Sequence, residues 1–233
     1  MRAALLDESQ RSSYRGPRMS VYQDALDSVD HFIKVASDIS KVRLLTDPQY
    51  KEEIAGSLYE ICQRLLDANG NMVRWLNRFL FFDFHGKNSS ERFGDLAREY
   101  NDAKATSELH EMKFRCGDIR IIYERDIKGR TDDLFAGDQA AGDEARDAFT
   151  ELGRADNSMV QFIHDEIVDN IDAFIEDVQH AHNLNLAERR RLVFNVTSSD
   201  LSKRLVRFAT ELSDLVLQYA TIAGRPVTLT KDP

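Results

Sequence analysis

Acidic side chains recur at helical spacing in the C-terminal half of the chain: Asp165, Asp169, Asp172 and Glu176, with His180 one turn further. On a helix these residues share one face, and carboxylates together with an imidazole are ligands that divalent cations accept. Di-metal sites in helical bundles use Glu-x-x-His pairs that point into the core, a motif this chain lacks. We therefore interpret the stripe as a solvated helix face and expect no bound metal and no cofactor.

The adjacent residues His164 and Asp165 offer a second candidate metal site. Such a pair resembles the metal-binding His-Asp of HD-type phosphohydrolases, which are all-helical. The resemblance implies a metal-dependent hydrolase, with His110 and Asp214 as residues that could complete the ligand set. The other interpretation, which we favour, is a solvated face opposite neighbouring isoleucines.

The segment 114–124 contains the run Arg-x-Gly-Asp-x-Arg-x-x-Tyr, formed by Arg115, Gly117, Asp118, Arg120 and Tyr123. It resembles the closing strands of RelE-type ribosome-dependent toxins, and the resemblance implies basic residues that act in RNA cleavage. Apolar residues also recur at helical steps over 109–127, which predicts a helix core face instead. We favour the helix and leave a strand over 114–124 open.

Basic residues are concentrated near the C-terminus, where Arg189 and Arg190 precede Lys203 and Arg207. On a helix the last two lie one turn apart and project together. Such a patch could bind an acidic partner or anionic lipid head groups. Pairing with acidic helices of the same bundle is the alternative that we favour.

The most apolar stretch runs from Phe79 to Phe84 and includes Phe82, and Trp75 precedes it by one helical turn. Consecutive apolar residues surround a helix axis, so one helix face cannot bury them all. The segment is therefore wholly buried, lies at an oligomer interface or enters a membrane interface. Core burial is the favoured alternative, and Trp75, Phe79 and Phe82 are the interface candidates.

A second candidate interface is a seam in the last helix, formed by Leu201, Leu205, Phe208 and Leu212. Apolar residues at alternating steps of four and three are typical of a coiled coil. The seam predicts a coiled-coil-like C-terminal helix.

The wider chain predicts an all-α fold, an elongated bundle of five to six long amphipathic helices. No proline interrupts 49–225. We expect helices over about 20–45, from 48 with either a kink or a division into two helices at Asn69-Gly70-Asn71, from Ser89, over 109–127, over about 145–178, and from 185 to 223. Residues 1–18 and 225–233 are predicted tails, 19–224 one bundle domain, and 136–143 an internal linker.

Composition narrows the classes of function. The chain has 233 residues, of which 31 are basic and 40 acidic, a formal charge of −9. Nucleic-acid binding is disfavoured because phosphate neutralisation requires basic surfaces. Two cysteines indicate no disulfide framework, and we expect a cytoplasmic protein.

These observations rank three functions. The leading hypothesis is a non-enzymatic helical scaffold or adaptor that mediates protein–protein interaction and associates with itself. The first alternative is a membrane-associating or lipid-disrupting bundle, with peripheral contact through an amphipathic helix and the basic patch. The second alternative is an all-helical metal-dependent hydrolase at His164 and Asp165. The sequence also leaves open whether this is a complete protein or a module of a longer one.

Overall fold

The structure is a computed structural model that describes residues 18–41, 47–105, 119–135, 137–152, 159–179 and 184–226. Every regular element in these ranges is helical, as the sequence predicts. The longer helices are α1 (Arg18–Ile39), α3 (Gly56–Leu80), α4 (Ser89–Ala105), α7 (Gln139–Leu152), α8 (Met159–Gln179) and α9 (Leu184–Ala223).

Shorter helical pieces gather at one end of the molecule, and two of them are π-helical. They are α2 (Pro48–Tyr50), η3 (Lys51–Ala55), η4 (Tyr123–Ile127), η5 (Lys128–Arg130) and α6 (Thr131–Leu134). The π-helical turns η3 and η4 pack against each other. π-Helical turns are rare and often occur at functional sites, which makes this end of the molecule a candidate site.

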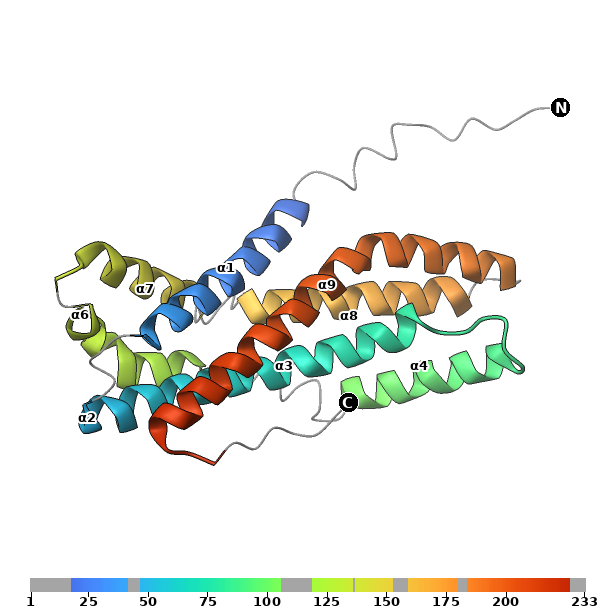
Figure 1. Cartoon of the computed structure of the whole chain (residues 1–233). Helices are drawn as coiled ribbons and strands as arrows, with labels where there is room; N and C mark the ends of the chain where they lie inside the picture. Colours follow the sequence, from blue (N-terminus) through green and yellow to red (C-terminus); the bar gives the residue numbers. More distant parts are fainter. Residues whose placement is uncertain are drawn as a thin grey trace.

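The helices form an elongated bundle in which α3, α4 and α8 run roughly along the long axis, and α9 lies in front of α3 (Figure 1). The contact between α3 and α9 is the most extensive in the described part of the chain. α1 packs against α7, α8 and α9. One continuous apolar core joins these helices.

The expected kink at Asn69-Gly70-Asn71 does not divide α3, which is continuous from Gly56 to Leu80. Asn69 is buried, and its Nδ2 donates to the Leu205 carbonyl of α9 at 2.7 Å. Asn usually disfavours helices because its side-chain amide competes for nearby backbone hydrogen bonds. Here the Asn69 side chain is engaged in the bond to α9 instead. α9 bends near its middle (Figure 1).

Two other boundaries differ from expectation. Residues 139–143 of the predicted linker are the first turn of α7, and the single helix expected over 145–178 is two helices, α7 and α8. The described part of the segment 109–127, residues 119–127, is helical, so no strand exists over 119–124. Residues 106–118, including Cys116, lie outside the described residues.

The end of α9 follows a common capping pattern. Gly224 has a φ of 66°, the Arg225 amide donates to the Ala220 carbonyl at 2.9 Å, and the Gly224 amide donates to the Thr221 carbonyl at 3.3 Å. This is a Schellman motif, in which glycine supplies the left-handed conformation. The helix therefore ends where Gly224-Arg225-Pro226 predicts.

Candidate functional surfaces

The aromatic stretch that sequence analysis named as a candidate interface is buried inside the single chain. Trp75, Phe79 and Phe82 are all buried. Phe79 meets Phe93 of α4 at a ring-centroid distance of 6.1 Å and Phe174 of α8 at 6.3 Å, both edge to face. Such geometry adds to the burial energy of aromatic pairs. These side chains join α3, α4 and α8.

The aromatic run does not have to fit on one helix face, because α3 ends at Leu80. Beyond that point Phe82 and Phe84 fold back onto Phe93, with centroid distances of 5.2 and 5.6 Å. Phe81 points the other way, and 79% of its surface is exposed. One member of the run is therefore left on the surface.

The C-terminal seam is also internal. Leu201, Leu205, Phe208 and Leu212 are buried, and α9 packs along α3. We call these residues the inner face of α9. An interface between subunits built from them would require α9 to leave its own bundle.

The predicted basic patch is divided by the structure. The side chains of Arg189 and Arg190 lie outside the described residues. Arg207 pairs with Asp30 of α1 and lies 3.8 Å from Glu211, while Lys203 is exposed. The pairing with Asp30 ties this part of the patch to an acidic helix of the same chain.

Arg204 makes a charged contact between α1 and α9, in addition to the buried hydrogen bond from Tyr219 Oη to the Ala36 carbonyl at 2.5 Å. Its NH2 atom lies 2.7 Å from Asp27 Oδ1 and 2.6 Å from Asp30 Oδ2, and only 19% of its side chain is exposed. Hydrogen bonds between opposite charges are the stronger kind. The sequence places Arg204 among the basic residues near the C-terminus, but it does not identify Asp27 and Asp30 as partners because they are distant in the chain.

The acidic stripe lies on α8. Asp165, Asp169 and Glu176 are exposed, and Asp172 pairs with Lys104 of α4 at 2.7 Å. His180 and the side chain of His164 lie outside the described residues, as does His110. Among the described side chains, no group of three or more His, Cys, Asp or Glu residues is placed to hold a metal.

The segment that resembles toxin strands contributes to the core where it is described. Tyr123 is buried and stacks on Phe149 of α7, with ring centroids 4.8 Å apart and planes 7° apart. Arg120 is exposed on the helical stretch 119–122. Arg115, Gly117 and Asp118 lie outside the described residues.

The π-helical end carries a polar cluster of Ser57, Arg125 and Asp126. Ser57 Oγ donates to Asp126 Oδ2 at 2.8 Å, and Arg125 donates to both oxygens of that carboxylate at 2.6 Å. Arg125 lowers the pKa of Asp126, burial opposes the shift and Ser57 adds to it. A carboxylate held ionised in this way is a weak base for activating a hydroxyl. The cluster therefore fastens η4 to α3 and is poorly suited to nucleophilic catalysis.

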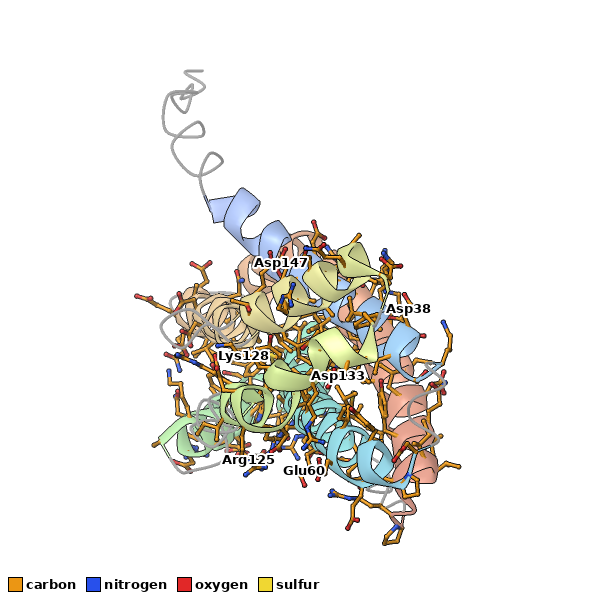
Figure 2. All side chains as sticks on the ribbon, turned by 90° about the vertical axis from the view of Figure 1, so that its left-hand side faces the viewer. Asp38, Glu60, Arg125, Lys128, Asp133 and Asp147 are labelled. Atoms are coloured by element: carbon orange, nitrogen blue, oxygen red, sulfur yellow. The ribbon has the colours of Figure 1, made fainter. Side chains whose placement is uncertain are left out.

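Further charged side chains surround this end. Figure 2 looks onto it and labels Asp38, Glu60, Arg125, Lys128, Asp133 and Asp147, which come from six different elements. Several are paired: Arg225 binds Glu60 at 3.0 Å, and Lys128 binds Glu124 at 2.8 Å.

An open hollow of about 510 Å³ nearby is lined by residues that include Phe135, Asp138 and Arg146. Asp138 accepts the Ala141 amide at 3.0 Å, so it caps α7.

The opposite side of α9 carries a second seam that sequence analysis did not identify. We call Val206, Thr210, Ser213 and Leu217 the outer face of α9. They follow steps of four, three and four residues, and Val206 and Leu217 are 49% and 38% exposed. Large exposed apolar side chains elsewhere in the described chain are Phe81 and Ile121.

The hydroxyls of the outer face bond to their own helix. Thr210 Oγ1 donates to the Val206 carbonyl at 3.2 Å, and Ser213 Oγ to the Ala209 carbonyl at 2.7 Å. A buried hydroxyl is costly only when it lacks a partner. The outer face can therefore be covered at little polar cost.

Comparison with family models, curated proteins and solved structures finds no match to this chain. None of the described helices is long and apolar enough to cross a membrane. Function must therefore be inferred from the surfaces described above.

Proposed function

We propose that this protein is a non-enzymatic helical scaffold that associates with itself and contacts its partner through the outer face of α9. The observation that carries the proposal is the exposure of Val206 and Leu217 on a helix whose other side is fully packed. Apolar residues at steps of four and three are the spacing with which helices pair. In this form the coiled-coil character predicted for the last helix belongs to pairing between copies.

The composition of the outer face favours pairing between two copies. The outer face spans about 17 Å along the helix, at 1.5 Å per residue. It contains no charged residue, and its hydroxyls already have acceptors. Because the surface is small, we expect weak, concentration-dependent association, with a Kd on the order of micromolar.

Light scattering on the purified chain tests the proposal over a concentration series. The parent is expected to shift from monomer toward dimer as its concentration rises to about 100 μM, as a micromolar Kd requires. Val206→Glu with Leu217→Glu is expected to remain monomeric with an unchanged circular dichroism spectrum. A parent that stays monomeric throughout would refute self-association.

Phe81→Ser is the matched control, because Phe81 is an exposed apolar residue far from the outer face in sequence. It is expected to leave the concentration dependence unchanged. If Phe81→Ser removes association and the double α9 variant does not, the interface lies at the end of α3 and the assignment to α9 is wrong.

A second candidate function is contact with a membrane surface, favoured by the 79% exposure of Phe81 at a helix end. An exposed aromatic residue can enter the interfacial region of a bilayer. Co-sedimentation with vesicles of neutral and of anionic lipid tests it. Binding that Phe81→Ser removes would support it, and no binding to either vesicle would exclude it.

A further inference from the structure

The edge of the outer face carries two opposite charges one heptad apart, Arg207 and Asp214. Both are exposed, and both lie next to members of the seam, Val206 and Ser213 respectively. On a helix they therefore share one edge of the outer face.

Such an arrangement is complementary to itself when a second copy is turned by a two-fold axis. In an antiparallel helix pair, residues on the same edge of both helices face each other. Arg207 of one copy then faces Asp214 of the other, and the two-fold axis repeats the pair in reverse. The same register sets Leu217 opposite Val206 and Thr210 opposite Ser213.

A parallel pair would lack this match. There, the edge with Arg207 and Asp214 would face the opposite edge of the partner helix, where Ser202 and Ala209 are uncharged and half-buried and Val216 is buried in its own bundle. Arg207 and Asp214 of each copy would then lie beside uncharged residues of the other copy, and no ion pair would form between the two helices. The charge pattern of α9 therefore favours the antiparallel pair over the parallel one.

Arg207 can serve both its own chain and a partner. Within the chain it pairs with Asp30, lies 3.8 Å from Glu211 and stands over the Phe208 ring at 5.4 Å, and 49% of the side chain remains exposed. A guanidinium carries five N–H donors in a planar fork, so Asp30 and Glu211 do not saturate it.

We infer that the partner of the outer face is a second copy of this chain, bound antiparallel about a two-fold axis near residues 210–213, with Arg207 facing Asp214 of the partner. The inference rests on the proposed function, because it names the orientation and register in which a second copy binds the same surface. Small side chains at Thr210 and Ser213 let the two helices approach closely at the axis, while Val206 and Leu217 close the ends of the contact.

Cysteine cross-linking tests the orientation in chains that carry Cys116→Ser. Cys62 is buried, which leaves it inaccessible to oxidation in the folded protein. A Val206→Cys chain is mixed with a mass-tagged Leu217→Cys chain under mild oxidation. The mixed disulfide is expected to dominate over both like-with-like products, and the chain with Cys116→Ser alone is expected to give none.

Charge reversal gives a second readout that needs no cysteine. Arg207→Glu alone and Asp214→Arg alone are each expected to weaken self-association about tenfold, since two attractive pairs become repulsive. An equimolar mixture of the two variants restores both pairs and is expected to regain the parent affinity. Gln218→Arg, exposed on the same helix but outside the seam, is the control for added charge.

The outcomes separate the two proposals. A parent that associates through the outer face but cross-links mainly 206 to 206, or all combinations equally, overturns the antiparallel pairing and leaves the proposed scaffold function standing. Failure of the mixed charge variants to regain affinity also overturns the pairing. A parent that does not associate at all refutes the proposed function, and the pairing with it.

Discussion

The two faces of α9 have the same residue spacing but different surroundings. The inner face, Leu201, Leu205, Phe208 and Leu212, is buried, whereas on the outer face Val206, Thr210 and Leu217 are exposed and Ser213 is half-buried. Large apolar side chains on the inner face hold the helix in its own bundle. Small and hydroxylated side chains on the outer face suit a contact that forms and dissociates.

The largest expected effect is on the inner face. Phe208→Ala should lower the free energy of unfolding by about 3–5 kcal/mol, because it removes a buried ring and leaves a cavity. Urea denaturation followed by circular dichroism measures it. A loss below about 1 kcal/mol, the range of an ordinary surface change, would mean that the inner face is not a core.

Asn69 tests how α3 and α9 are joined. Asn69→Ala should cost about 1–3 kcal/mol, because the buried Leu205 carbonyl loses the donor at 2.7 Å. Thermal unfolding measures the loss. Asn71→Ala is the control from the same turn, and an equal cost for both would show that the interhelical bond contributes nothing.

Arg204 tests the tie between α1 and α9. Arg204→Met keeps much of the side-chain length and should cost about 1–2 kcal/mol, since Asp27 and Asp30 lose a half-buried partner. The difference from the parent should shrink in high salt, which screens the ion pairs. A difference that does not depend on salt would point to lost packing alone.

The smallest effect on stability is expected on the outer face. Leu217→Ala should change the free energy of unfolding by less than about 0.5 kcal/mol, because the side chain is already partly solvated in the monomer. Urea denaturation at low protein concentration measures it. A loss above about 2 kcal/mol would place Leu217 in the core and remove the contrast between the two faces.

The sequence predicted the helical class and identified the apolar seam of α9, because both depend on periodicity alone. It interpreted that seam as an interface, whereas the structure buries it in the chain's own core. It did not predict the continuity of α3 through Asn69-Gly70-Asn71, since the Leu205 carbonyl that engages Asn69 is distant in the chain. Local turn propensity was outweighed by a tertiary bond.

The outer face was hidden for a different reason. Thr210 and Ser213 count as polar in a sequence, and only the structure shows that their hydroxyls bond to carbonyls of α9 itself. The aromatic run was interpreted correctly as too wide for one helix face, but the end of α3 at Leu80, which separates exposed Phe81 from buried Phe82, was not foreseen.

Sedimentation velocity on two neighbouring variants tests the central claim most directly. Leu217→Glu and Gln218→Glu add the same charge to adjacent exposed positions, but only Leu217 belongs to the outer face. At about 100 μM, well above a micromolar Kd, Gln218→Glu should sediment as a dimer like the parent and Leu217→Glu as a monomer. Equal dimer fractions in both variants, or none in the parent, would contradict the account.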